Sequence, residues 1–402
     1  MSYYILPKKN IEFKFNIIID ASNDALEPVI SNSLFFYLND MNKQIENIIK
    51  SEGEYKCDDS YREKEKEKEK EVSFGLLNKI MNPYEFIFTK VPNTKLSVSK
   101  LKPFSNTFYI FMEIINMFNL LDFFEEKNIK TIHYGPNSMA IIECLDMLRE
   151  DSDDINVMYP SIDPSINTLN VSSIELLSYE LKEYEYNETN KYIIGMIHIL
   201  CNIIQQQSAN GIAIIKIHNI FYKPIIDVLY ILSSMYEKIY IIKPNNSGIY
   251  TNHRYIICKN FILNINKQKL YHQYLKNLQD IFLYEKRETK TILCSLIRNE
   301  IPYYFLNKIE ESNIITGHQQ LDYMNQLVAL YKNKNKDDKI EIIKKNNIQK
   351  CIQWCEKFKI PYNKFTDKVN IFLPLIKIGS NDFYTDNDIN EMVDELLDNE
   401  LL

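Results

Sequence analysis

The chain has 402 residues, of which 45% are hydrophobic and 25% charged, so it can hold one large globular domain with extensions or two domains. Its formal net charge of −7 excludes a globally basic nucleic-acid-binding protein, and any RNA contact has to come from a local patch. The first residues lack a signal-peptide core and no apolar run approaches the length of a bilayer span, so we expect no membrane partner.

Residues 1–89 are predicted to form an N-terminal extension. It contains a β segment over residues 11–19 and a helix around residues 33–50. Residues 62–71 read REKEKEKEKE, an alternation of charges that cannot bury a face. This run predicts a solvated loop or a short exposed helix, with a partner-binding tether as the alternative.

Residues 90–262 are predicted to form an α/β domain, because β-branched runs alternate with amphipathic helical segments. The expected strands are residues 129–133, 155–158, 174–179, 211–218, 238–244 and 254–261. The expected helices are a long one from Asn106 and residues 140–149, 188–207 and 224–236. This order implies a mostly parallel sheet with right-handed crossovers and an antiparallel last strand.

Helical periodicity replaces the strand pattern beyond residue 262, which predicts a helical extension over residues 263–375. The expected helices are residues 268–284, 302–312, 319–333 and 349–358. An acidic tail over residues 376–402 is either frayed or docked through an amphipathic piece at 389–397. Trp354, the only tryptophan, is interpreted as a core anchor or as an interface residue.

Seven cysteines are scattered through mostly apolar segments. They form neither a C-x-x-C pair nor a cysteine and histidine cluster with the spacing of a metal site. We therefore expect no metal, and we interpret the cysteines as reduced core residues of a cytoplasmic protein. They are Cys57, Cys144, Cys201, Cys258, Cys294, Cys351 and Cys355.

Lys216 stands inside an otherwise apolar predicted strand, where an unpaired ammonium would be costly to bury. We expect it to emerge at the carboxyl end of the sheet, because open α/β sheets place their sites there. A lysine at the sheet edge whose charged end reaches solvent is the alternative interpretation.

The stretch from Gly211 to Phe261 resembles the second half of FtsJ-like RNA ribose 2′-O-methyltransferases, including the cap-specific enzymes. In that family a lysine-bearing strand and a helix precede a strand ending in K-P, a serine-containing loop and the sequence E-R-Y-V-V-C-K. Here residues 243–247 read KPNNS and residues 254–259 read RYIICK, with no gap needed. The resemblance covers residues 105–261 and implies a Rossmann-like S-adenosylmethionine-dependent methyltransferase fold.

The resemblance implies S-adenosylmethionine as the cofactor, held by the turn after the first strand of the domain. The family's turn reads close to A-P-G-G-F, and its glycines let backbone N–H groups approach the methionine half of the ligand. The corresponding residues here are Gly135, Pro136, Asn137 and Ser138. The proline is retained and the glycine pair is not, so we predict weak or absent cofactor binding.

The resembled enzymes surround the ribose hydroxyl with lysine, aspartate, lysine and glutamate, which stabilise the charge that develops on the oxygen. The resemblance carries these roles to Ile110, Glu180, Lys216 and His253, of which Lys216 alone is unchanged. A hydrocarbon at Ile110 can neither donate nor titrate, and the ring of His253 replaces a carboxylate. We interpret Lys216, Glu180 and His253 as a degenerate catalytic set, unless an alignment slip hides the true lysine.

These departures predict a catalytically degenerate homologue that works as a structural or stimulatory component of an RNA-capping or RNA-modification assembly. The resemblance extends to the inactive small subunit of poxvirus-type mRNA capping enzymes. We therefore expect a protein partner, either a catalytic subunit or a second copy of the chain, with RNA as a further partner. If the protein comes from a virus, we expect it in the viral factory or in the virion.

Two alternatives stay open. The first is an active S-adenosylmethionine-dependent mRNA cap or RNA ribose 2′-O-methyltransferase. The second is a cofactor-free RNA-binding module, in which Lys216, Lys243, Arg254 and Lys259 would contact phosphates and Tyr250 would stack on a base.

Overall fold

The computed structural model describes residues 3–9, 12–20, 26–54, 73–162, 173–285, 292–334 and 337–365. Its contacts divide the chain into one unit at Met1–Asn363 and another at Lys364–Leu402, and the first unit is described below. The charged repeat at 62–71, Cys57, the acidic tail and its amphipathic piece at 389–397 lie outside the described residues. The predicted domain boundaries stay a prediction.

Seven strands form the main sheet, in the order β1-β7-β8-β6-β5-β3-β4. Their bounds are β1 Tyr3–Leu6, β3 Lys130–Tyr134, β4 Ile155–Tyr159, β5 Ile174–Tyr179, β6 Gln207–Ile217, β7 Tyr236–Ile242 and β8 Arg254–Phe261. Neighbours among β3, β4, β5 and β6 pair in parallel, and β8 lies antiparallel between β6 and β7. This confirms the predicted Rossmann-like fold of the methyltransferase type, with a mostly parallel sheet and an antiparallel last strand.

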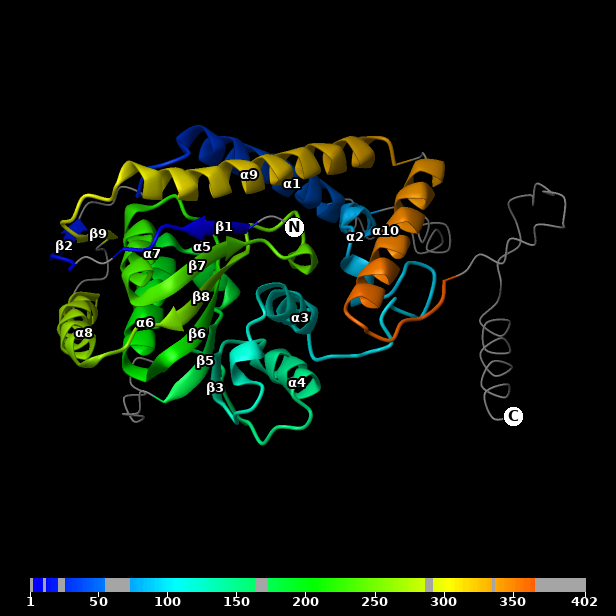
Figure 1. Ribbon diagram of the computed structural model, residues 1–402. Helices are drawn as coiled ribbons and strands as arrows, with labels where there is room; N and C mark the ends of the chain where they lie inside the picture. The colour runs from blue at the N-terminus through cyan, green and yellow to red at the C-terminus, as the bar shows by residue number, and fades with distance from the viewer. Residues whose placement is uncertain are drawn as a thin grey trace, which may run out of the picture. The chain divides into compact units, whose positions relative to one another are not determined.

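Helices cover both faces of this sheet (Figure 1). On one face lie α6 (Thr189–Gln206) and α7 (Lys223–Met235), which pack against each other and bury long apolar stripes. On the other face lie α3 (Thr107–Phe118) and α4 (Ser138–Leu148). Pro224 in the first turn of α7 favours a helix start there, because its missing N–H has no partner to lose.

Two strands escaped sequence analysis because their partners are far away in the chain. β1 pairs antiparallel with β7 and so extends the main sheet with residues from the N-terminal end. β9 (Ile292–Ile297) pairs with β2 (Phe15–Asp20) in a second, two-stranded sheet. Pairing across such sequence separations leaves no local period to recognise. The expectation that almost no strand signal follows residue 261 was therefore wrong at β9.

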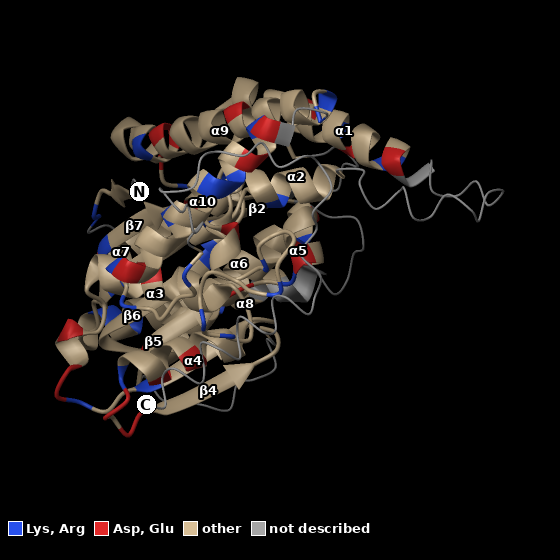
Figure 2. Ribbon diagram, turned by 90° about the vertical axis from the view of Figure 1, so that its right-hand side faces the viewer, with Lys and Arg blue, Asp and Glu red and all other residues tan. Residues whose placement is uncertain are grey.

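The remaining helices pack around the main sheet and its covering helices, with α5 and α8 against α6. They are α1 (Asn32–Glu54), α2 (Phe74–Met81), α8 (Ile265–Glu285), α9 (Tyr303–Lys332) and α10 (Asp337–Lys357), with short helices α5 (Glu183–Asn187), η2 (Glu85–Ile87), η3 (Asp122–Phe124) and η4 (Asn245–Ser247). α9 lies along α1 and contacts β1, while α2 contacts both α9 and α10. Both basic and acidic residues occur along α1 and α9 (Figure 2). These helices complete the unit and are not a separate layer.

The predicted helices at 302–312 and 319–333 form one continuous helix, α9. Gly317 lies where the sequence suggested a break, and a Cβ there would sit 2.5 Å from a methyl carbon of Leu34. The glycine therefore permits close contact with α1 instead of ending the helix. Trp354 on α10 is buried and packs edge-on against Tyr109 of α3, with ring centroids 5.8 Å apart, so it is a core residue of this unit.

Five of the described cysteines are buried and have free thiols, namely Cys144, Cys201, Cys258, Cys351 and Cys355. No helix in the described ranges is both long and apolar enough to span a bilayer. No cluster of three or more potential metal ligands occurs among the residues that were placed.

Candidate functional site

Lys216 and Glu180 form an ion pair at the carboxyl ends of β6 and β5. The distance between Lys216 Nζ and Glu180 Oε1 is 2.6 Å, and the two side chains are 13% and 9% exposed. β5 and β6 are parallel neighbours, so residues at their carboxyl ends meet. Lys216 thus lies where the sequence predicted, and its ammonium has a buried partner.

The predicted cofactor turn reaches the same carboxylate. Asn137 Nδ2 lies 3.1 Å and 3.0 Å from the two carboxylate oxygens of Glu180. One carboxylate is therefore held by an ammonium and an amide from two different strand ends. The ammonium, the carboxylate and the amide thus find hydrogen-bond partners in one another, and these bonds fix the positions of all three side chains.

A cavity of about 230 Å³ opens beside this network. Its lining consists of Ser105, Asn106, Thr107, Ile110, Asn137, Lys216, Asn246, Ser247, His253 and Tyr255. Ile110 on α3 is 6% exposed and forms an apolar part of the wall. The structure therefore brings together the four predicted catalytic positions and Asn137, with Glu180 joined to the cavity through Lys216. Whether these residues act on a substrate stays a prediction.

The His253 ring is neutral at physiological pH. Burial lowers its pKa strongly, and the positive charge of Lys216 lowers it further. The ring lies 5.7 Å from Tyr186 and 5.5 Å from His218, centroid to centroid, and its buried Nε2 has no hydrogen-bond partner among the described atoms. His253 therefore supplies Lys216 with neither the charge nor the hydrogen bond of the carboxylate found in the resembled family.

Gly135 permits a close approach between strands. Its φ is +132°, and an added Cβ would lie 2.4 Å from the backbone oxygen of Glu180. The Gly135 N–H donates to the Tyr159 carbonyl over 2.8 Å, and Ser138 Oγ donates to the Gly135 carbonyl over 2.8 Å. The Gly135 N–H is thus bonded to the end of β4, and Ser138 is bonded to the Gly135 carbonyl within the turn, so neither is left to form the backbone cradle that the methionine half of S-adenosylmethionine needs. The turn does not fit that cofactor.

Glu113 is a site residue that sequence reasoning missed. It is 3% exposed on α3, and its carboxylate accepts a hydrogen bond from Asn245 Nδ2 over 2.7 Å. Burial raises its pKa to about 6, against the opposing effect of hydrogen bonds from Asn246 and Asn245. Glu113 thus ties α3 to the loop after β7. An acidic residue within the apolar run IFMEIINMF was the available signal.

The residues of the predicted RNA-binding surface do not share one surface. Lys216 belongs to the network above, while Lys243 and Arg254 line a different cavity. Lys259 Nζ donates to the carbonyls of Phe118 and Asn119. Since Lys259 is five residues from Arg254 along β8, the two lie about 17 Å apart along the strand.

Comparisons with solved structures show a distant likeness. No family model and no curated protein matches the chain. Among solved structures, the chain is similar to one from Plasmodium falciparum named "ribosomal RNA methyltransferase, putative", at 14% identity and a TM-score of 0.31. The match covers 40% of this chain and 99% of that one. The likeness is too weak to carry an argument about activity, and the fold rests on the strand order described above.

Proposed function

We propose that this protein is a FtsJ-like methyltransferase homologue that has lost methyl transfer and serves as a structural or stimulatory component of an RNA-capping or RNA-modification assembly. The single observation that carries the proposal is the Asn137–Glu180–Lys216 network. It engages the one retained catalytic lysine and the cofactor turn in contacts within the chain. A lysine next to a carboxylate is shared with the resembled enzymes, so the departure is the contact of Asn137 with Glu180 in place of a glycine pair in the cofactor turn.

The other wall of the cavity supports the same proposal. Ile110 offers no donor, and the neutral ring of His253 offers no negative charge. Methyl transfer from a sulfonium to a ribose hydroxyl requires that the hydroxyl lose its proton and that the developing charge be stabilised. Lys216 would have to do both without the second lysine and the second carboxylate of the resembled enzymes, because Ile110 and His253 stand at those positions.

A titration with S-adenosylmethionine tests the proposal directly. We expect no dissociation constant at or below about 1 μM by calorimetry, a value that corresponds to about 8 kcal/mol of binding. The matched variant is the double substitution Asn137→Gly, Ser138→Gly, which frees Glu180 and removes both Cβ atoms. Tight binding by the unmodified chain would contradict the proposal, and tight binding by the variant alone would identify this turn as the cause.

An active cap or RNA 2′-O-methyltransferase is the competing function, and Lys216 is the observation that favours it. The decisive assay uses S-adenosylmethionine labelled on its methyl group, with capped and uncapped RNA. We expect no transfer from the unmodified chain. If transfer is seen and Lys216→Ala reduces it by roughly 100-fold or more, the protein is an enzyme and our proposal is wrong.

The assembly role requires a partner, which we propose to be a catalytic subunit or a second copy of the chain. Removing the residues after about 265 is not a usable test, because α9 supplies Asn313, whose side chain donates to the Ile220 carbonyl in the core over 2.9 Å. The full chain should instead be recovered from its host, and its associated proteins identified and their stoichiometry measured. The assembly role would be contradicted if the recovered chain is a monomer and no RNA-processing enzyme accompanies it in a comparable amount.

A further inference from the structure

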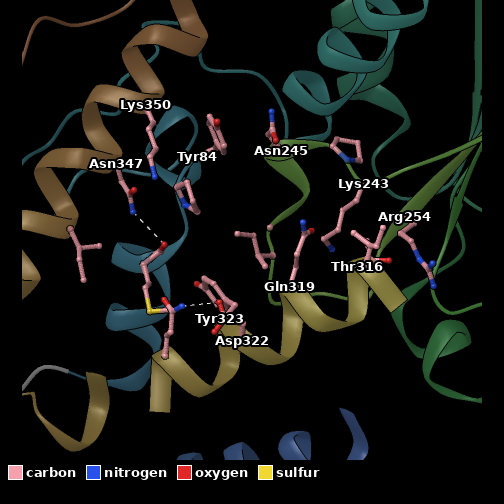
Figure 3. Close-up of a pocket in the computed structure, with 18 of the residues that line it drawn as sticks. Tyr84, Lys243, Asn245, Arg254, Thr316, Gln319, Asp322, Tyr323, Asn347 and Lys350 are labelled. Carbon is pink, nitrogen blue, oxygen red and sulfur yellow. Dashed lines mark hydrogen bonds between the residues drawn. The ribbon is translucent and has the colours of Figure 1, made fainter. Parts of the chain in front are cut away.

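A second and larger cavity, of about 750 Å³, lies between the β7–β8 edge of the sheet and helices α2, α9 and α10. Small-molecule sites in proteins commonly enclose about 300–1,000 Å³. The cavity is separate from the smaller one beside Lys216, which is lined by other residues. Its walls come from β1, from both ends of the β7–β8 connection and from the helical extension, so residues far apart in sequence meet there (Figure 3).

Two basic side chains meet at one end of this cavity. Lys243 follows β7 and Arg254 begins β8. Arg254 is 5% exposed, and its Nη1 donates to Ser312 Oγ over 3.3 Å. Lys243 Nζ donates to the carbonyls of Thr251 and His253. A guanidinium has five N–H donors and an ammonium has three, so both retain donors that these bonds do not use.

No carboxylate in the described part of the chain forms an ion pair with Lys243 or Arg254. Burial lowers the pKa of Lys243 to about 7, and the nearby positive charge of Arg254 lowers it further. Burial likewise lowers the pKa of Arg254 to about 10. A buried guanidinium beside a partly buried lysine, with no counter-charge from the described residues, destabilises a fold. Such an arrangement is compensated when an anion binds between them.

The rest of the lining is basic as well. Lys339 and Lys350 contribute from α10, and Asp322 on α9 is the acidic residue of the lining. Four basic residues against one acidic residue give this cavity a positive charge in a chain whose net charge is −7. An anionic ligand is therefore attracted to this cavity against the field of the rest of the molecule.

Planar groups line the cavity away from the two cations. Figure 3 shows Tyr84, Asn347 and Lys350 at the opposite end from Lys243 and Arg254, with Tyr323 between them. The Tyr323 hydroxyl donates to Asn78 Oδ1 over 2.8 Å, which holds the ring in the wall. Tyrosine rings stack on planar heterocycles, and the amide side chain of Gln319 can pair with the polar edge of such a ring.

We propose that this cavity binds a nucleotide, with its phosphate on Lys243 and Arg254 and its base near Tyr84 and Tyr323. A guanidinium matches two phosphate oxygens with parallel N–H donors, and the neighbouring ammonium neutralises the second charge of a phosphomonoester. The same chemistry is offered by a free nucleoside monophosphate and by the phosphorylated 5′ end of an RNA strand. The site is independent of the proposed function, because none of its residues belongs to the predicted catalytic or cofactor set.

Calorimetry on the full chain tests the site with defined probes. These are adenosine and guanosine 5′-monophosphate, adenosine, inorganic phosphate, and a short oligoribonucleotide with either a 5′-phosphate or a 5′-hydroxyl. We expect at least one monophosphate to bind with a dissociation constant of about 100 μM or tighter. Adenosine should not bind measurably, since the charged contacts carry the interaction. Preference for the phosphorylated oligonucleotide over both monophosphates would identify an RNA end as the ligand.

Substitutions link binding to the cavity. Arg254→Gln and Lys243→Gln should each weaken binding by about 10-fold or more, as expected for the loss of a charged hydrogen bond. Lys238→Gln is the matched control, because Lys238 is an exposed lysine of the same strand, β7, and lies outside the cavity. Its binding should be unchanged. Lys350→Glu, at an exposed position of α10, gives a second test if the Arg254 and Lys243 variants fail to fold, and it too should weaken binding.

Two results would overturn the site. One is the absence of binding by every phosphate-bearing probe at millimolar concentration. The other is binding that is equally tight in the unmodified chain and in the folded variants Arg254→Gln, Lys243→Gln or Lys350→Glu. Neither result bears on the S-adenosylmethionine titration, so failure of this site and failure of the proposed function can be distinguished.

Discussion

The two cavities of this molecule treat their charged groups in opposite ways. Beside Lys216, the ammonium, the Glu180 carboxylate and the Asn137 amide hold one another. In the larger cavity, Arg254 is buried and Lys243 is partly buried, and no carboxylate among the described residues pairs with either. The first arrangement stabilises the chain on its own, whereas the second is complete only with an anion. The smaller cavity, which the family resemblance predicts to be the active site, thus has its charged groups paired within the chain. The larger cavity, for which the resemblance predicts nothing, is prepared for a ligand.

The largest expected effect comes from breaking the self-contained network. Glu180→Ala leaves the Lys216 ammonium buried without its partner, which should lower the free energy of unfolding by about 4 kcal/mol. Urea unfolding measures the loss. The control is Glu188→Ala, which removes the exposed partner of Lys191 and should change stability by less than about 1 kcal/mol. Equal losses in the two variants would mean that the Lys216 pair is not structurally important.

Gly135→Ala tests whether the cofactor turn is closed by the chain itself. Its positive φ strains any side chain, and the added Cβ would meet the Glu180 carbonyl, so stability should fall by about 3 kcal/mol. Gly75→Ala on α2 is the matched control, since nothing lies within 4 Å of its Cβ position. A Gly135→Ala protein as stable as the control would show that the turn has room for a ligand.

Glu113, which accepts a hydrogen bond from Asn246 in the wall of the smaller cavity, makes the stability of the chain sensitive to pH. Its folded-state pKa of about 6 lies above the usual value of 4.5, so the folded chain holds this proton more tightly than the unfolded chain. Its contribution is therefore largest below pH 4.5 and is lost as pH rises to 6, a change of about 2 kcal/mol. Glu113→Gln should flatten that part of the stability curve, measured by unfolding at several pH values. An unchanged curve would place Glu113 in a more polar environment than its contacts indicate.

The smallest expected effect is a gain. Arg254→Met replaces a buried, unpaired charge with an apolar chain of similar length, so stability should stay equal or rise by about 1 kcal/mol. Thermal unfolding without ligand measures it. A substantial loss would mean that Arg254 has a structural role, and the contrast between the two cavities would then disappear.

Much of the smaller cavity was predictable because its residues lie in segments with strong periodicity. The strand signals around Glu180 and Lys216 were local, and parallel pairing brings the ends of neighbouring strands together. The larger cavity was not predictable in this way. Lys243 and Arg254 were recognised only as basic residues, and nothing local indicated that α10, about one hundred residues later, would face them.

The sequence by itself determined the order of helices and strands from Asn106 to Phe261, because local apolar periods and the rules of parallel crossovers are sufficient for that. The strand pattern also singled out Lys216, whereas Ile110, Glu180 and His253 were selected only by the resemblance to the FtsJ-like family. The tertiary structure alone decided that β1 and β9 pair with distant strands, that Asn137 reaches Glu180, and that His253 stays neutral. It also decided that Lys243 and Arg254 have no carboxylate partner among the described residues. Burial and charge pairing depend on groups that converge from distant parts of the chain, so they become defined only when the chain is folded.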